Sequence, residues 1–370
     1  MYSENLTNID LLKSGEHTIE TIALIEVAGS HDECLLTQMH AIRGSGNRVV
    51  LVCTQEIRER NPHFEPYVDS FYIVSFDGNS LKRIGEMRRT LKFMEKKGVT
   101  RAVLNTAQGD LMRNLCMIAL FSSIEFTGII HTTRKLKGSF TQRMISRKVK
   151  KYMLLSEYLL STVEAPKGVS LDYFYPIRFV TSTEVMEKRT KVVTIIGGVE
   201  NRRKDLNGFL QMIEQIQDAN VRFFFLGKSD PSNEDVQRFQ EKIKDLGLTE
   251  KIVTFDDFVP QKEFSTCLNN TDLILPLIHP DTPSADQYFK NQISGAMSIS
   301  FGYKIPMLIH EAYENIEEMN AASFYYSSDN FSAVLSSSLQ AVDSKRTAMN
   351  NDGRYSIEKQ EERYLNFLFS

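Results

Sequence analysis

The stretch KVVTIIGGVENRRKDLNGFL, residues 191–210, decides the fold. It starts with a β-branched run, predicted as a strand at Val192–Ile196, that ends in Gly197 and Gly198. A charged loop follows, and the apolar spacing from Asp205 onward predicts a helix to Gln217. Strand, turn and helix in this order form the repeating unit of a parallel sheet with helices on its faces.

The same alternation extends along the chain in both directions. Towards the N-terminus the predicted strands are Ile22–Ala28, Arg48–Thr54, Phe71–Ser75, Arg101–Asn105 and Phe126–His131, and the predicted helices are Glu33–Arg43, Leu81–Lys97 and Asp110–Phe121. Towards the C-terminus the predicted strands are Val221–Leu226, Ile252–Phe255, Asp272–Ile278 and Met307–His310, and the predicted helices are Glu234–Leu246, Gln261–Leu268, Asn291–Phe301 and Asp329–Val342. The pattern predicts an α/β fold of two doubly wound, Rossmann-like halves, with ligands bound in the cleft between them, beyond the carboxyl ends of the strands.

A less regular stretch, Val163–Thr190, separates the two halves. It holds two prolines and several charges, as expected of a domain boundary. We therefore expect an N-terminal domain over residues 1–178, a C-terminal domain over 179–345 and a C-terminal helical segment over 346–370.

The composition is that of an ordinary globular protein. A length of 370 residues suits two domains, and 42% apolar with 25% charged residues excludes a disordered or fibrous chain. A net charge of −3 argues against a protein that coats nucleic acid. The four cysteines have no metal-type spacing and indicate buried thiols in a reducing compartment. No run approaches the ~20 apolar residues of a membrane span, so a cytoplasmic, soluble protein is expected.

Most motifs of nucleotide and metal enzymes are absent from the sequence. There is no GxxxxGK[ST] loop, no nucleophile elbow, and no HExxH or paired metal carboxylates at a strand end. Gly44 and Gly46 lie between a predicted helix and a strand, which is the context of a helix-ending turn and not of a dinucleotide fingerprint. The sequence therefore predicts a protein without a metal or a cofactor.

The loop after Gly198 carries Arg202, Arg203 and Lys204. Glycines let a ligand approach the backbone, and cations beside them can neutralise a phosphate. The alternative is a solvated charged loop, and the position at the carboxyl end of a strand favours the phosphate site.

From this loop onward the chain resembles the retaining glycosyltransferases of the GT-B fold, in particular the group 1 (family 4) type. The order and spacing of the pieces carry the resemblance, since none is specific alone. The pieces are Gly197-Gly198 with Lys204, Leu226-Gly227-Lys228, Phe258-Val259-Pro260, Thr271-Asp272-Leu273-Ile274-Leu275-Pro276, and Gly302 with Pro306.

The resemblance implies a donor site on the second domain. Lys204, with Arg202 or Arg203, would bind the donor diphosphate and stabilise the charge of the leaving nucleotide. Gly197 and Gly198 would let that phosphate sit against the backbone. The nucleotide base would be bordered by Gly227, Phe258 and Val259, although Phe258 is equally explained by core packing.

One departure concerns a pair of glutamates, seven residues apart, that the family carries before the glycine and proline. Asp281 and Asp286 are the only acids in the corresponding stretch, residues 279–306, and Asp286 is the candidate acceptor for sugar hydroxyls. Ser294 and Gly295 open a predicted helix whose N–H groups suit a phosphate or a sugar hydroxyl, the alternative for Ser294 being a plain N-cap. The missing pair leaves open an inactive transferase.

The resemblance is looser in the N-terminal half. His131, followed by a threonine after the strand that ends at Ile130, matches a histidine that contacts the transferred sugar in the family. The alternative is a histidine satisfied within the structure. Gly29 corresponds to a glycine loop near the donor phosphates but lacks the second glycine, and His31 is a weaker candidate.

Residues 134–151 hold eight basic residues and no acid, with apolar residues between them. Such a stretch fits the surface of an anionic membrane or a solvated helix that attracts an anionic ligand, and nucleic acid is not expected. The GT-B resemblance further implies that the helix at Arg354–Phe369 crosses back to pack on the N-terminal domain.

Together these features predict a metal-independent, retaining glycosyltransferase that moves a sugar, a hexose by resemblance, from a nucleotide diphosphate donor to a glycan or lipid-linked acceptor. The expected setting is cell-surface polysaccharide synthesis in the cytoplasm, with peripheral contact at the inner face of the membrane. Two alternatives remain: a nucleotide-sugar epimerase of GT-B architecture, and a non-catalytic nucleotide- or glycan-binding protein.

Overall fold

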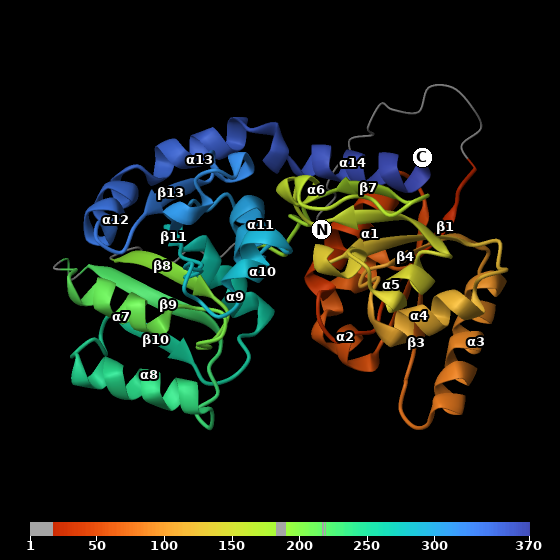
Figure 1. The fold of residues 1–370 in the computed structure, drawn as a ribbon, viewed down its shortest axis with the longest axis horizontal. Coiled ribbons are helices and arrows are strands. Elements are labelled where there is room, and N and C mark those ends of the chain that lie inside the picture. Colours follow the sequence, from red (N-terminus) through yellow and green to blue (C-terminus); the bar gives the residue numbers. More distant parts are fainter. Residues whose placement is uncertain (1–17, 183–189, 217, 219) are drawn as a thin grey trace, which may run out of the picture. The chain divides into compact units, whose positions relative to one another are not determined.

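The computed structural model describes residues 18–182, 190–216, 218 and 220–370 (Figure 1). The chain forms two compact units. Unit 1 comprises Met1–Arg178 and Glu358–Ser370, and unit 2 comprises Phe179–Ile357. Each is built around one parallel sheet, as the alternation of strands and helices predicts.

Unit 1 contains a seven-stranded sheet in the order β3-β2-β1-β4-β5-β6-β7, with every pairing parallel. The strands are β1 Thr21–Glu26, β2 Arg48–Cys53, β3 Ser70–Ile73, β4 Val99–Leu104, β5 Glu125–Ile130, β6 Val149–Leu154 and β7 Ser170–Tyr173. The helices are α1 Leu35–Gly44, α2 Gln55–Arg60, α3 Ser80–Lys96, α4 Gly109–Ile118, α5 Phe140–Ile145, α6 Tyr158–Ser161 and α14 Ile357–Phe369, with short 3-10 turns at Asp32–Cys34, Pro62–Tyr67 and Thr133–Leu136. The strand order reverses between β1 and β4, which is where such sheets bind ligands.

Unit 2 contains a six-stranded sheet in the order β10-β9-β8-β11-β12-β13, again parallel throughout. The strands are β8 Lys191–Ile196, β9 Val221–Lys228, β10 Ile252–Phe255, β11 Leu273–Ile274, β12 Met307–His310 and β13 Ser323–Tyr326. The helices are α7 Leu206–Glu214, α8 Glu234–Asp245, α9 Gln261–Asn269, α10 Ala285–Lys290, α11 Gly295–Tyr303, α12 Phe331–Gln340 and α13 Val342–Asn351, with 3-10 turns at Glu311–Tyr313, Glu317–Met319 and Gly353–Tyr355.

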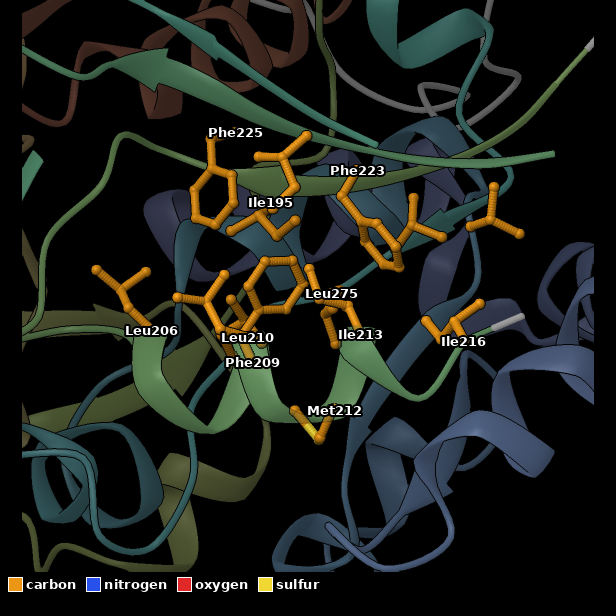
Figure 2. Close-up of a cluster of buried hydrophobic side chains, with 14 of the residues drawn as sticks. Ile195, Leu206, Phe209, Leu210, Met212, Ile213, Ile216, Phe223, Phe225 and Leu275 are labelled. Atoms are coloured by element: carbon orange, nitrogen blue, oxygen red, sulfur yellow. The ribbon is translucent and has the colours of Figure 1, made fainter. Parts of the chain in front are cut away.

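The core of unit 2 lies between α7 and the sheet (Figure 2). Phe209 of α7 meets Phe223 and Phe225 of β9 edge to face, at centroid distances of 5.3 and 5.5 Å. Leu206 and Ile213 extend the same buried face of the helix. This packing fixes the start of α7, and with it the loop that carries the charged residues, against the carboxyl end of the sheet.

The last helix, α14, packs on unit 1, as the sequence predicts. The buried Tyr364 hydroxyl donates to Gln38 Oε1 at 3.2 Å, and Arg363 Nε donates to an Asp172 carboxylate oxygen at 2.9 Å. Arg178 Nε donates to Glu361 at 2.6 Å. The chain therefore returns to unit 1 for its final helix, whereas α13 belongs to unit 2.

The basic segment, residues 134–151, is not one helix. Gly138, with φ +91°, and the N-cap Ser139 divide it, and its end forms β6. Three of its apolar side chains, Leu136, Ile145 and Val149, are buried in the unit's own core. These three side chains are therefore not at the surface of the unit, whereas Phe140 is 65% exposed. Among the helices of the described ranges, none has the length and apolar character needed to cross a bilayer.

Other differences from the predicted elements have local causes. The strand expected at 272–278 is only Leu273–Ile274, because Pro276 lacks an N–H for the ladder and Leu277 has φ +57°. The helix expected at 291–301 starts later, at Gly295, and a separate helix, α10, precedes it. Strands β6, β7 and β13 were not predicted.

Candidate functional site

The two glycines at the end of β8 lie against the end of β9. A Cβ on Gly198 would lie 1.7 Å from the carbonyl oxygen of Lys228, and one on Gly227 would lie 2.6 Å from Gly197 Cα. Gly197 has φ +86°, a conformation that other residues rarely adopt. Close packing therefore requires glycine at Gly198 and Gly227, and the backbone conformation favours it at Gly197.

Lys204 lies over the glycine pair. Its Nζ donates to the Gly198 carbonyl at 3.0 Å, and a Cβ on Gly197 would approach that Nζ to 3.2 Å. The side chain is 8% exposed, and burial lowers its pKa from the usual 10.5 to about 8, with the charge of Glu200 opposing the shift. An ammonium has three donors, and within the described part of the chain Gly198 supplies its one hydrogen-bond acceptor, with no salt bridge. The result is a buried cation at the carboxyl end of a strand.

The two neighbouring arginines differ from Lys204. Arg202 Nη2 lies 3.1 Å and Arg203 Nε 3.3 Å from Glu200 carboxylate oxygens, and both side chains are more than half exposed. Exposed pairs of this kind contribute little to stability. Their exposure agrees with the alternative of a solvated charged loop. Because the ion pairs with Glu200 are exposed, either arginine can leave Glu200 and pair with another anion.

A hydrogen-bonded cluster follows Lys204 directly, in which a half-buried aspartate meets two buried side chains. Asp205 caps α7 by accepting from Gly208 N–H at 2.9 Å, and its other oxygen accepts from His279 Nδ1 at 2.7 Å. His279 Nε2 lies 2.6 Å from the Tyr326 hydroxyl. Because a carboxylate can only accept, Nδ1 carries a proton, and in the neutral ring Nε2 accepts from Tyr326. The bond from His279 lowers the pKa of Asp205.

Sequence reasoning missed this cluster. His279 follows the strand end at Pro276, a position that could have been noticed, but Tyr326 lies in β13, which was not predicted. The Asp205 N–H also donates to the carbonyl of Leu277 at 3.0 Å. The loop after β11 is therefore docked on the start of α7, beside Lys204.

The remaining predicted donor residues are more dispersed. Asp286, at the start of α10, is 86% exposed and pairs with Lys290 at 2.7 Å. Ser294 caps α11 by accepting from Ala296 N–H at 3.4 Å, and Gly295 is exposed. The Arg202 carbonyl accepts from Ser284 Oγ at 2.7 Å, which ties the start of α10 to the charged loop.

The two residues predicted beside the nucleotide base differ in burial. Phe258 is 69% exposed, so the alternative of core packing is wrong. Val259, its neighbour, is 6% exposed and belongs to the buried residues of the unit.

In unit 1, His131 follows β5 and stacks on His31, with ring centroids 3.7 Å apart and planes at 18°. Its Nε2 donates to the Asn105 carbonyl at 2.7 Å. Burial, together with the charge of His31, lowers the pKa of His131 to about 3. Burial also acts to lower the pKa of His31, but Glu33, together with the charges of Glu26 and Asp32, outweighs it and leaves that pKa above its usual value. Gly29, with φ +72°, begins the same loop.

A second group that sequence reasoning missed holds this loop. Glu26 is fully buried at the end of β1 and accepts from Asn105 Nδ2 at 2.7 Å and from Thr106 Oγ1 at 2.6 Å. Burial raises the pKa of Glu26. Asn105 Nδ2 also donates to the His31 carbonyl at 2.8 Å, so Asn105 contacts both histidines. The sequence did offer a signal for this group, because polar residues stand at the ends of the apolar strands β1 and β4.

Within the described ranges, no group of three or more His, Cys, Asp or Glu side chains is placed to hold a metal ion. Cys34, Cys53 and Cys116 are buried and Cys267 is half-buried.

No protein-family model matches the sequence, and no curated protein matches it. Solved structures match along nearly its whole length. The Anabaena protein Alr3699/HepE in complex with UDP-glucose has a TM-score of 0.69 at 10% identity, over 94% of this chain and 99% of that one. A glycosyltransferase from Rickettsia africae has a TM-score of 0.67 at 11% identity, over 95% and 98%. The chain has the GT-B fold.

The GT-B fold does not by itself select an activity. UDP-GlcNAc 2-epimerase from Neisseria meningitidis, bound to UDP-GlcNAc, also matches, with a TM-score of 0.59 at 10% identity over 94% of this chain and 99% of that one. The side chains at the carboxyl ends of the two sheets must therefore carry any argument about function.

Proposed function

We propose that this GT-B protein is a retaining, metal-independent glycosyltransferase that uses a nucleotide diphosphate sugar as its donor. The observation that carries the proposal is the buried Lys204 ammonium, held by one carbonyl at the carboxyl end of β8. Burying a cation with so few partners is unfavourable, which an anionic ligand at this position would offset. Solved structures of the same fold with bound UDP-glucose and UDP-GlcNAc support a diphosphate as that ligand.

In this proposal Lys204 binds the donor diphosphate and stabilises the charge that develops on it as the sugar leaves. Arg202 and Arg203 contribute by exchanging Glu200 for phosphate oxygens. The donor phosphate takes the proton of the acceptor hydroxyl, as the resemblance to retaining enzymes implies. Gly197 and Gly198 let the donor phosphates lie against the backbone, and Gly227, near the end of β9, borders the nucleotide base.

The proposal assigns further roles on unit 2 by resemblance. Phe258 and Val259 border the nucleotide base, and the 69% exposure of Phe258 leaves its ring available for stacking. Asp286, Ser294 and Gly295 contact the sugar, with the half-buried cap of α11 offering N–H groups to an oxygen.

On unit 1, His131 and Gly29 contact the transferred sugar and the donor phosphates. Since Nε2 of His131 is bonded to Asn105, the neutral ring offers Nδ1 as an acceptor for a sugar hydroxyl. The acceptor is a glycan or a lipid-linked glycan of cell-surface polysaccharide synthesis, and the sugar is a hexose. Contact with the inner face of a membrane, and with it a cytoplasmic location, is supported by the exposed Arg134, Lys135 and Lys137 near the exposed Phe140.

The first experiment is a thermal-shift panel of nucleoside diphosphates and nucleotide sugars on the wild type, Lys204→Ala and Lys244→Ala. Lys244 is an exposed lysine of α8 and serves as the matched control. One nucleotide should raise the melting temperature of the wild type and of the control, but not that of Lys204→Ala. Transfer is then measured with the sugar nucleotide of that base and a set of glycan acceptors. No shift with any nucleotide contradicts the proposal.

The epimerase alternative gains support from the Asp205–His279–Tyr326 cluster, which supplies an acid–base side chain beside Lys204. It predicts conversion of UDP-GlcNAc without any acceptor, visible by NMR. The transferase proposal predicts no such conversion. Binding of a nucleotide sugar without conversion or transfer would instead indicate the non-catalytic binding protein.

A further inference from the structure

The histidines of unit 1 are supported by a chain of buried hydrogen bonds that begins on the last helix, α14 (Figure 1). The Tyr364 hydroxyl of α14 donates to Gln38 Oε1 of α1 at 3.2 Å. Gln38 Nε2 donates to the Cys34 carbonyl at 3.0 Å and to Oδ1 of Asn105, directly after β4, at 2.6 Å. The side chains of Tyr364, Gln38 and Asn105 are fully buried. The orientation of the Gln38 amide is therefore fixed, because its oxygen meets a donor and its NH2 group meets two acceptors.

Asn105 connects this chain to both histidines. Its Oδ1 accepts from Gln38, and its Nδ2 donates to Glu26 Oε2 at 2.7 Å and to the His31 carbonyl at 2.8 Å. Its own carbonyl accepts from His131 Nε2 at 2.7 Å. One buried residue thus bonds to the main chain of one histidine and to the ring of the other. Because a carbonyl only accepts, the His131 ring carries its proton on Nε2.

The bond from Asn105 holds His31 in an unfavourable backbone conformation. His31 has φ +70°, in the left-handed region that residues other than glycine rarely adopt. Such a conformation persists where the surrounding structure fixes it. The His31 carbonyl accepts from Asn105 Nδ2 and from the Cys34 N–H, the latter at 3.2 Å. In this conformation the His31 ring stacks on His131, so loss of the Asn105 amide should release the ring.

The stack keeps His131 neutral. Burial, together with the charge of His31, lowers the pKa of His131 from 6.5 to about 3. Burial also acts to lower the pKa of His31, but the carboxylates around it outweigh burial and leave it raised. These carboxylates belong to Glu33, Glu26 and Asp32, and Asp32 is also paired with Arg60 of α2 at 2.8 Å. A displaced His31 ring would therefore make His131 easier to protonate.

We propose that Asn105 is a positioning residue for the sugar contact of His131 and that Gln38 holds the Asn105 amide in place. Asn105 keeps the proton of His131 on Nε2 and the ring of His31 stacked on it, so that His131 Nδ1 stays an acceptor for a sugar hydroxyl. Tyr364 extends this support to α14. The inference rests on the proposed function for the role of His131, whereas the tautomer and the stack can be measured on the free protein.

The test is NMR of the free protein with isotope-labelled histidine, which reports the tautomer and the protonation of each ring between pH 4.5 and pH 7.5. The signals of His131 are those that His131→Leu lacks. In the wild type His131 should be neutral over this range, with its proton on Nε2. In Asn105→Ala the pKa of His131 should rise from about 3 to about 5 or higher, and the Nδ1–H tautomer should appear. Gln38→Met should cause the same changes to a smaller degree.

Two other buried amide residues of unit 1 provide matched controls. Asn47 Nδ2 donates to Ser45 Oγ at 3.0 Å, and Gln142 Nε2 donates to the Ala107 carbonyl at 3.0 Å. Asn47→Ala and Gln142→Met should lower the melting temperature, because each leaves a buried partner unpaired. Both should leave the tautomer and the protonation of His131 as they are in the wild type.

Three results would overturn the proposal. They are a wild-type His131 that titrates above pH 5 or carries its proton on Nδ1, an Asn105→Ala variant that melts lower but leaves His131 unchanged, and equal changes of His131 in Asn47→Ala. If Asn105→Ala does not fold, Gln38→Met is compared with Gln142→Met by the same criteria. The test needs no nucleotide. A failure to bind nucleotides therefore contradicts the proposed function alone, and an unchanged His131 contradicts the positioning role alone.

Discussion

Replacement of Lys204 by methionine should stabilise the protein while it removes nucleotide binding. Burial lowers the pKa of this lysine from 10.5 to about 8, which corresponds to about 3 kcal/mol against the charged form at pH 7. Methionine has a similar length and carries no charge. The lost hydrogen bond to the Gly198 carbonyl offsets about 1 kcal/mol, so a net gain of about 2 kcal/mol is expected at pH 7.

The stability gained by Lys204→Met should decrease as the pH rises. Between pH 8 and 10.5 the unfolded chain holds a proton on Lys204 that the folded chain does not, so the stability of the wild type rises with pH in this window. The advantage of Lys204→Met should therefore shrink by about 1 kcal/mol between pH 7 and pH 9.

Melting temperatures by scanning calorimetry at pH 7 and pH 9 measure both effects, at about 2–4 °C per kcal/mol for a unit of this size. Lys244→Met, at an exposed position of α8, is the control and should change stability by less than about 0.5 kcal/mol. A Lys204→Met variant that melts lower than the wild type at pH 7, or a difference independent of pH, would refute the reasoning.

Four further substitutions test other parts of the site. Gly198→Ala should lower the free energy of unfolding by about 1–3 kcal/mol or more, because its Cβ would lie 1.7 Å from a carbonyl oxygen. Gly295→Ala is the control, since the space around Gly295 is open, and its melting temperature should not fall. Differential scanning fluorimetry measures both melting temperatures. His279→Leu should cost about 1–3 kcal/mol in urea titrations, because it leaves Asp205 and a tyrosine hydroxyl unpaired. Since the pKa of Asp205 is lowered from 3.8, its contribution is present above that pH, and the deficit of Asp205→Asn should shrink as the pH falls below it. The pKa of His131 is lowered from 6.5 to about 3, so between these pH values the unfolded chain binds a proton that the folded chain does not. His131 should therefore cost the wild type about 2 kcal/mol of stability between pH 7 and pH 5. His131→Leu should not show this loss, and melting temperatures at the two pH values measure it.

The elements that the sequence located well are those whose local pattern agrees with their environment. β10 at Ile252–Phe255 and β12 at Met307–His310 have the predicted bounds, because short apolar runs flanked by turn residues leave little choice of conformation. β6 was missed because two of its first three residues, Lys150 and Lys151, are lysines of a basic stretch. Its buried half becomes a strand through pairing with β5 and β7, which no local pattern records.

In the candidate site, too, features set by local sequence could be predicted, and contacts between distant residues could not. Lys204 could be predicted as a candidate because its loop follows a strand and a glycine pair along the chain. The partner of Asp205, His279, lies 74 residues away, and the partner of Glu26, Asn105, lies 79 residues away. Such contacts arise only when strands distant in sequence become neighbours in a sheet, so a single sequence does not reveal them.

Isothermal titration calorimetry of the nucleoside diphosphate from the thermal-shift panel, at pH 8.5 in two buffers of different ionisation enthalpy, tests the donor site most directly. A diphosphate beside Lys204 raises its pKa again, so binding should take up roughly three quarters of a proton from the buffer. Lys244→Ala should bind in the same way, and Lys204→Ala should lose most of the affinity. Binding without proton uptake, equal affinity of the Lys204→Ala variant, or no binding of any nucleoside diphosphate would contradict the account.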